Sequence, residues 1–166
     1  PALYRRAAAL PHIDVQGIDC RIGSQVTDLS VYVEAAEKVF DLVDRIERDG
    51  IALHHVDLGG GLGVPEKPGQ VPVDLAALQG VIDDLHGRWP QLALWLEPGR
   101  FLVAQAGVLL AQVTQLKGKG AVQYVGVATG MNSLIRPALY GAHHDIVNLL
   151  RFGEPGTEIY TVVGPI

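Results

Sequence analysis

The chain has 166 residues, of which 48% are hydrophobic, and its formal net charge is −5. This length allows one sizeable core, or one domain and part of another. The basic residues are scattered rather than clustered, which argues against nucleic acid or an anionic membrane surface as a partner. Cys20 is the single cysteine, so no disulfide can form within the chain. With neither a secretory signal nor a run of about 20 apolar residues, a cytoplasmic protein is expected.

The first part of the chain is predicted to alternate strands and helices. A strand from Val15 to Ile22 precedes a helix from Ser30 to Arg48, with Ser30 as N-cap and Gly50 just beyond the end. Apolar residues recur in this helix near helical spacing, namely Val31, Ala35, Val39, Leu42, Val43 and Ile46.

A second and a third strand follow the same pattern. Residues 51–58 (IALHHVDL) form the second strand, and a glycine-rich loop leads to a helix from Asp74 to Arg88, with Asp74 as cap. Residues 91–97 (QLALWLE) form the third strand. Strands that alternate with helices predict parallel β-α units, and ligands bind such folds at the carboxyl ends of the strands.

The sequence changes character near Gly107, so residues 1–106 and 107–166 are predicted to form an α/β part and a β-rich part. No long amphipathic helix is expected after that point, and the Lys117–Gly120 turn is interpreted as a solvated hairpin. Four short strands are predicted within residues 107–120, 121–130, 144–151 and 157–164.

Two candidate phosphate-binding segments follow the first two strands. Gly59, Gly60 and Gly61 lack side chains, so their N–H groups can approach an anion closely. Ser24, after the first strand, could donate a hydrogen bond to the same anion. Glycine runs also form tight turns, and a serine can satisfy backbone groups locally, so both structural interpretations stay open.

The third strand ends in Glu97-Pro98-Gly99-Arg100. A carboxylate at a strand end can pair with a protonated ring nitrogen, and an arginine three residues later can bind a phosphate or carboxylate in bidentate fashion. The alternative is a surface ion pair beside a turn, which contributes little stability. A buried strand favours the functional interpretation of this pair.

A fourth candidate lies in the segment MNSLIRPALY, residues 131–140. Arg136 and Tyr140 flank a turn stiffened by Pro137, so a cation and a phenol could face one substrate carboxylate. A snorkelling arginine beside a half-buried tyrosine would give the same sequence.

The histidine pairs His54-His55 and His143-His144 are weak signals for a metal. Adjacent side chains in a strand point to opposite faces, so neither pair readily supplies two ligands to one ion. We expect these histidines to be structural and predict no metal site.

The four segments GIDCRIGSQ, HVDLGGGLGV, LEPGR and MNSLIRPALY, taken in this order, resemble the signatures of diaminopimelate decarboxylases. These are fold-type III pyridoxal-phosphate enzymes, related to alanine racemase and ornithine decarboxylase. The resemblance extends from Val15 to Ile166. It implies part of a β/α (TIM-type) barrel that binds pyridoxal 5'-phosphate, followed by the start of a β-rich domain.

The resemblance also implies roles for individual residues. Glu97 would face the pyridine nitrogen and keep it protonated, which strengthens the ring as an electron sink. The substrate would be meso-2,6-diaminopimelate, which loses a carboxylate to give L-lysine and CO₂. The cofactor-binding residues would be Arg21, Ser24, Gly59, Gly60, Gly61, Glu97, Gly99 and Arg100, and the substrate would contact Arg100, Arg136 and Tyr140.

Three departures from the family pattern bear on activity. The Schiff-base lysine of the family lies upstream of the matching segment, so no catalytic residue is expected within this chain. The family continues beyond the residues that match Val163–Ile166 into a Cys-Glu-Ser segment. Arg21 stands where the family usually has a histidine stacked on the ring. We therefore expect a fragment that is inactive by itself and, as the full-length enzyme, a homodimer.

Two other functions remain open at this stage. One is a related decarboxylase acting on another basic amino acid. The other is a non-catalytic homologue that binds pyridoxal phosphate, which the arginine at position 21 favours.

Overall fold

The structure is a computed structural model that describes residues 1–165. The chain divides into two compact units. The first comprises Pro1–Pro65 and Val71–Ala106, and the second comprises Glu66–Gln70 and the chain from Gly107 onward.

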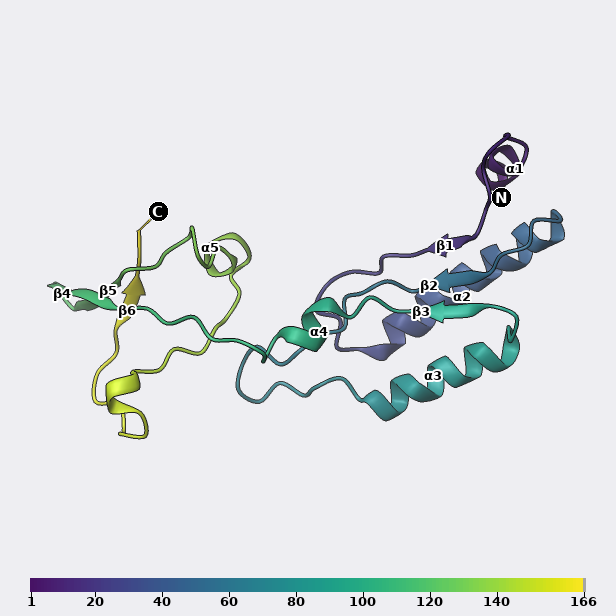
Figure 1. Ribbon diagram of the computed structural model, residues 1–166. Coiled ribbons are helices and arrows are strands. Elements are labelled where there is room, and N and C mark those ends of the chain that lie inside the picture. Colours follow the sequence, from purple (N-terminus) through teal and green to yellow (C-terminus); the bar gives the residue numbers. More distant parts are fainter. Residues whose placement is uncertain (166) are drawn as a thin grey trace. The chain divides into compact units, whose positions relative to one another are not determined.

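The first unit contains a parallel sheet of three short strands in the order β1-β2-β3 (Figure 1). Its strands are β1 (Gly17–Asp19), β2 (His55–Asp57) and β3 (Ala93–Trp95), connected by helices α2 (Leu29–Arg48) and α3 (Leu75–Arg88). This β-α-β-α-β order confirms the predicted α/β class. Only three residues of each predicted strand pair with a neighbour, so the strands are shorter than expected.

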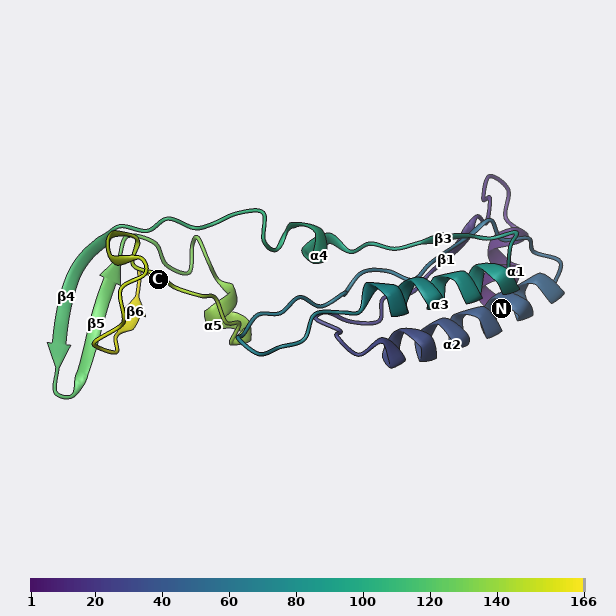
Figure 2. The same cartoon turned by 90° about the horizontal axis from the view of Figure 1, so that it is seen from below.

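Both long helices pack on one face of this sheet, and Figure 2 shows them side by side. Because side chains alternate along a strand, the central residue of each strand, Ile18, Val56 and Leu94, joins the core with the helices. From α2 the buried residues are Tyr32, Ala36, Val39, Phe40, Val43 and Ile46.

Capping residues determine where the two helices begin. Asp74 caps α3 as predicted, accepting hydrogen bonds from the N–H groups of Ala76 and Ala77. The prediction that Ser30 caps α2 is wrong, because the cap is Asp28, whose carboxylate accepts a hydrogen bond from the Ser30 N–H at 2.9 Å. A carboxylate also interacts favourably with the positive end of the helix dipole.

The opposite face of the sheet is not covered by α2 or α3. His55 and Trp95 stack there, with ring centroids 4.0 Å apart and planes inclined by 10°. Gly17 lies beside His55, where a β-carbon would come within 2.5 Å of Nε2. Asp19 and Asp57 belong to the same face, at the carboxyl ends of their strands.

Two short helices complete the first unit. Helix α1 (Ala2–Ala8) contains Tyr4, whose hydroxyl donates to the Gly17 carbonyl at 3.3 Å. Helix α4 (Gly99–Val103) begins directly after Pro98, so the turn predicted at the end of the third strand leads into one helical turn.

The second unit contains a sheet of order β4-β5-β6. Strands β4 (Val113–Lys119) and β5 (Val122–Val127) form an antiparallel hairpin whose turn includes Gly120 at φ +60°, and β6 (Thr161–Val163) pairs in parallel with β5. The predicted hairpin is therefore confirmed. The prediction of a strand within residues 144–151 is wrong. This segment contains a 3₁₀ helix (Leu149–Arg151), which the Asn148 side chain caps.

The segment around Arg136 is also more regular than predicted. Instead of a turn, residues Arg136–Tyr140 form helix α5, which has a proline in its first turn and ends at Gly141 with φ +63°. No helix within residues 1–165 is both long and apolar enough to cross a membrane.

Candidate functional site

The three strands of the first unit run parallel, so the segments that follow them gather at one edge of the sheet. Figure 1 shows these segments leaving the sheet on the same side. Two of them, from the ends of β1 and β2, are joined through Val26, which pairs with Leu62 as a parallel bridge. The glycine run lies within this group of segments.

Close backbone packing explains why three consecutive glycines occur after β2. Gly59 and Gly61 have φ values of +70° and +95°, a region that disfavours other residues. A β-carbon would also collide with a neighbouring carbonyl oxygen at each position. The oxygens are those of Cys20 at 2.5 Å from Gly59, Glu97 at 2.4 Å from Gly60, and Gly23 at 2.4 Å from Gly61.

All three glycine carbonyls accept hydrogen bonds from other parts of the unit, which fixes the orientation of each peptide. The donors are the Glu97 N–H to Gly59 at 2.9 Å, the Tyr32 hydroxyl to Gly60 at 2.8 Å, and the Val26 N–H to Gly61 at 2.8 Å. A trans peptide points its N–H away from its carbonyl, so these bonds also set the direction of the following N–H groups.

The N–H groups of the run differ in their partners. The Gly59 N–H donates to Asp57 Oδ1 at 2.8 Å. The N–H groups of Gly60 and Gly61 have no hydrogen-bond acceptor within residues 1–165. Two adjacent backbone donors without acceptors, on peptides fixed by their carbonyls, form a ready site for an anion.

Three carboxylates lie at the same edge of the sheet. Oxygens of Asp19, Asp57 and Glu97 are within 4.8 Å of one another. Like charges at this separation repel unless a cation or a protonated group lies between them. This grouping was not predicted from sequence because the three residues belong to separate strand ends, although each directly follows or ends an apolar strand. The prediction of no metal stays a prediction.

The other predicted cofactor-binding residues belong to the segments that follow β1 and β3. Arg21 and Ser24 are exposed and lie in the segment after β1, and Ser24 follows Gly23, which packs on Gly61. Gly99 and Arg100 are the first two residues of α4, and the Gly99 N–H donates to the Glu97 carbonyl at 2.8 Å. Arg21 forms no ion pair with Asp19 among the described residues.

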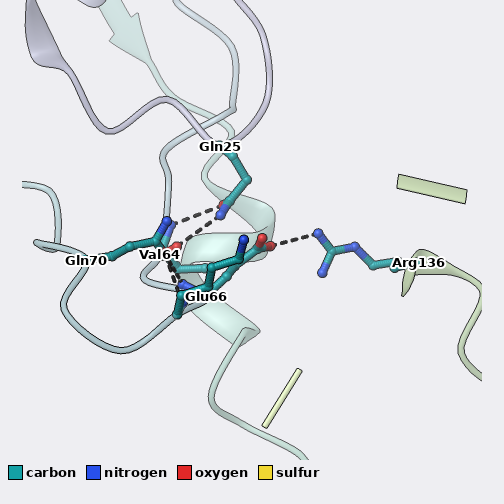
Figure 3. A network of polar contacts seen from close by, with 6 residues as sticks. Gln25, Val64, Glu66, Gln70 and Arg136 are labelled. Atoms are coloured by element: carbon teal, nitrogen blue, oxygen red, sulfur yellow. Dashed lines mark hydrogen bonds and ion pairs between the residues drawn. The ribbon is translucent and has the colours of Figure 1, made fainter. Parts of the chain in front are cut away.

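Gln25 helps to hold the segments of this site together, a role that was not predicted from the sequence. It has a φ of +59°, and its side-chain amide both donates to the Val64 carbonyl at 2.9 Å and accepts from the Val64 N–H at 3.1 Å (Figure 3). The side-chain amide makes the same pair of hydrogen bonds to Val64 that the backbone of a neighbouring strand would make. It thereby connects the segment after β1 to the residues that follow the glycine run.

Arg136 and Tyr140 belong to the second unit. Arg136 Nη2 lies 2.8 Å from Glu66 Oε1, with side chains that are 29% and 20% exposed (Figure 3). Gln70 Oε1 accepts hydrogen bonds from the N–H groups of Glu66 and Lys67, closing a tight turn. Tyr140 lies four residues after Arg136 on the same helix and is exposed, so both side chains share one face of α5.

Tyr32 is the second residue of this region whose role is not evident from the sequence. The apolar spacing predicted Val31 on the buried face of α2, but Val31 is 40% exposed and Tyr32 is 2% exposed. Burial raises the pKa of the Tyr32 phenol, so the group stays protonated and donates its hydrogen bond. The one available signal is the residue type, because a tyrosine hydroxyl requires a partner when it is buried.

Comparisons with known proteins identify the family of this chain. Residues 2–104 match the family model of the pyridoxal binding domain of pyridoxal-dependent decarboxylases. The diaminopimelate decarboxylase of Pseudomonas aeruginosa is 46% identical over 165 residues, which are 99% of this chain and 39% of that protein. This chain thus spans about two-fifths of the length of that relative.

Solved structures give the same result. AQ1208 from Aquifex aeolicus is 38% identical with a TM-score of 0.90, and the match covers 98% of this chain and 40% of that one. Diaminopimelate decarboxylase from M. jannaschii in co-complex with L-lysine is 36% identical with a TM-score of 0.86, over 98% and 38% of the two chains. The chain belongs to the pyridoxal-dependent decarboxylase family, through its pyridoxal-binding domain.

Proposed function

We propose that the complete protein is a pyridoxal-phosphate-dependent diaminopimelate decarboxylase, which converts meso-2,6-diaminopimelate to L-lysine and CO₂ in lysine biosynthesis. The observation that carries this proposal is the pair of N–H groups without acceptors at Gly60 and Gly61, in a loop that packs against Glu97. An anion site next to a carboxylate suits a cofactor with a phosphate at one end and a basic ring nitrogen at the other.

The phosphate would be held by the glycine run and its neighbours. Gly60 and Gly61 offer backbone donors, and Ser24 adds a hydroxyl from the neighbouring segment. Gly99 and Arg100 would complete the group from the start of α4, where a guanidinium can bind phosphate in bidentate fashion. The uncommitted N–H groups and the absence of β-carbons at the three glycines support this assignment.

Glu97 would accept a hydrogen bond from the ring nitrogen and keep it protonated. Asp19 and Asp57 lie within 4.8 Å of this carboxylate and add negative charge, which favours a positively charged ring nitrogen. Pyridoxal phosphate, when bound, supplies the electron sink that accepts the pair of electrons left as carbon dioxide departs. Arg21 would lie against the ring in the position where the family usually has histidine.

The substrate would contact Arg100, Arg136 and Tyr140. Diaminopimelate carries two carboxylates, and an arginine matches a carboxylate with two parallel donors. The contact between Arg136 and Glu66 holds one guanidinium nitrogen in place and supports a fixed orientation for the remaining donors. The chain's own residues would therefore bind and orient, while the lysine that bonds to the cofactor would come from outside it.

The same proposal covers the organisation of the protein. Residues 1–106 would be part of the cofactor-binding β/α barrel, and residues 107–166 the beginning of a C-terminal β domain. The complete enzyme would be a cytoplasmic homodimer with an amino acid as its small-molecule substrate and without nucleic acid or membrane partners.

Assay of the complete gene product tests the proposal. Incubation with meso-diaminopimelate and pyridoxal phosphate should release equimolar CO₂ and L-lysine, and omission of the cofactor should abolish release. Lysine, ornithine and arginine form the control panel. If one of these amino acids is turned over faster than diaminopimelate, that amino acid is the substrate. If the protein binds the cofactor but turns over none of them, it is a non-catalytic homologue.

A further inference from the structure

Tyr32 supplies the one polar side-chain group in the buried core of the described residues. The other buried side chains are aliphatic or phenyl groups, and no buried polar or charged residue accompanies them. Tyr32 packs with Leu62, Val73 and Leu78 in a small cluster that includes the residue directly after the glycine run. A phenylalanine would fill the same space without burying a hydroxyl, so the position of this hydroxyl calls for a specific explanation.

The hydroxyl is directed at the middle carbonyl of the glycine run. Its oxygen lies 2.8 Å from the Gly60 carbonyl oxygen, 28 residues away in sequence. The hydrogen bond satisfies a partly buried acceptor and attaches the loop to helix α2. Helix α2 is anchored in turn by six buried residues, so the donor is held on a rigid element.

The planar peptide group couples this hydrogen bond to the orientation of the next N–H group. The Gly60 carbonyl and the Gly61 N–H belong to one planar trans peptide and point in opposite directions. Glycines impose little restraint of their own on the rotation of this plane. A hydrogen bond that fixes the carbonyl therefore fixes the N–H, and the Gly61 N–H is one of the two N–H groups of the glycine run that have no acceptor within residues 1–165.

We propose that Tyr32 is a positioning residue for the phosphate of the cofactor, acting through the Gly60–Gly61 peptide. It does not touch the ligand; it holds the Gly61 N–H toward the phosphate, so its contribution is specific to the phosphate and absent for the rest of the cofactor. This inference rests on the proposed pyridoxal-phosphate site.

The test compares Tyr32→Phe with the parent in the complete gene product, prepared free of cofactor. Dissociation constants are measured by absorbance titration for pyridoxal phosphate and for pyridoxal, which lacks the phosphate. Loss of the hydrogen bond that orients this peptide should raise the dissociation constant for pyridoxal phosphate about 3- to 10-fold. The dissociation constant for pyridoxal should not change. The ³¹P resonance of the bound cofactor should also shift, since it reports the donors around the phosphate.

Tyr4→Phe is the matched control. Tyr4 also donates its hydroxyl to a backbone carbonyl, that of Gly17 at 3.3 Å, and burial raises the pKa of its phenol as well. Its acceptor lies in β1 and not in the glycine run, so this variant should keep the parental ratio of the two dissociation constants.

The outcomes separate this inference from the proposed function. A parent that binds pyridoxal phosphate no more tightly than pyridoxal would contradict the phosphate site itself. A parent that prefers the phosphate, combined with a Tyr32→Phe variant of unchanged preference, would overturn the role of Tyr32 alone. Equal weakening of both ligands, or loss of the native circular dichroism spectrum, would also overturn it by indicating a general role in folding.

Discussion

Arg136 and Glu66 form a close ion pair, with 2.8 Å between Nη2 and Oε1, although 70 residues separate them in the sequence. Their side chains are 29% and 20% exposed, which distinguishes this pair from the exposed pair of Lys38 and Glu34 on α2. Glu66 is itself held by the turn that Gln70 closes. A guanidinium fixed at one nitrogen can present its remaining donors in a constant direction.

The first prediction follows from this pair. Glu66→Gln in the complete gene product should raise KM for diaminopimelate about 3- to 10-fold with a smaller change in kcat, because the weaker contact leaves Arg136 less well oriented. Steady-state kinetics measures this. Glu34→Gln is the control, since it removes an exposed pair on a helix and should change neither constant. An unchanged KM for Glu66→Gln would contradict the positioning role.

The second prediction concerns the glycine run. Gly60→Ala should lower the affinity for pyridoxal phosphate at least about tenfold, because its β-carbon would lie 2.4 Å from the Glu97 carbonyl oxygen and the backbone would have to shift. Gly80→Ala is the matched control, since Gly80 lies inside α3 and, apart from its neighbours in the helix, no atom lies within 4 Å of the added carbon. That variant should bind the cofactor normally and gain about 0.5–1 kcal/mol in stability. Cofactor titration gives the affinities and chemical denaturation gives the stabilities. Equal affinity of Gly60→Ala and the parent for pyridoxal phosphate would contradict the argument from close packing.

The secondary structure of the first unit could largely be predicted from sequence because its helices carry a strong periodic signal. The beginning of α2 was misplaced, since Asp28 and Ser30 are both good capping residues and only the fold selects between them. Helix α5 was missed because five residues carry no measurable periodicity. The predicted site residues come from local motifs, whereas Tyr32 acts through a contact across 28 residues, which no local pattern encodes.

The third prediction concerns local stability. Amides of α2 and β2 should exchange with solvent at least about 100-fold more slowly than those of β4 and β5, because the first unit has a buried core and every residue of β4 is exposed. Hydrogen exchange on this 166-residue chain, followed by mass spectrometry of peptides, measures the difference. Comparable protection in the two units would show that the second unit is stabilised in a way its described contacts do not explain.

The fourth prediction is that the four lysines of this chain form no stoichiometric covalent adduct with pyridoxal phosphate. Lys38 pairs with Glu34 on the exposed face of α2, and Lys117 and Lys119 belong to the exposed strand β4. None of these positions lies at the carboxyl ends of β1 to β3, and Lys67 belongs to the turn beside Glu66. Borohydride reduction of this chain with the cofactor, followed by peptide mapping, is the test. A single stoichiometric adduct on any of the four would contradict the prediction.

The last prediction concerns Arg21, which lies in the segment after β1. In the complete gene product, Arg21→His should raise kcat about 3- to 10-fold and leave the affinity for pyridoxal phosphate nearly unchanged. A guanidinium stays charged at any working pH, whereas an imidazole can lie neutral against a protonated ring. Removal of that fixed charge would favour protonation of the ring nitrogen that Glu97 is proposed to face, and a protonated ring is the stronger electron sink.

The alternative is that Arg21 turns away from the ring and pairs with a carboxylate such as Asp19. Its charge would then not disfavour protonation of the ring nitrogen. Arg21 and Asp19 form no ion pair within residues 1–165. Comparison of turnover and cofactor affinity between parent and Arg21→His decides the matter. Equal turnover would favour pairing with a carboxylate. A fall in turnover on introducing histidine would show instead that the arginine contributes to the reaction, through a contact that the electrostatic argument does not include.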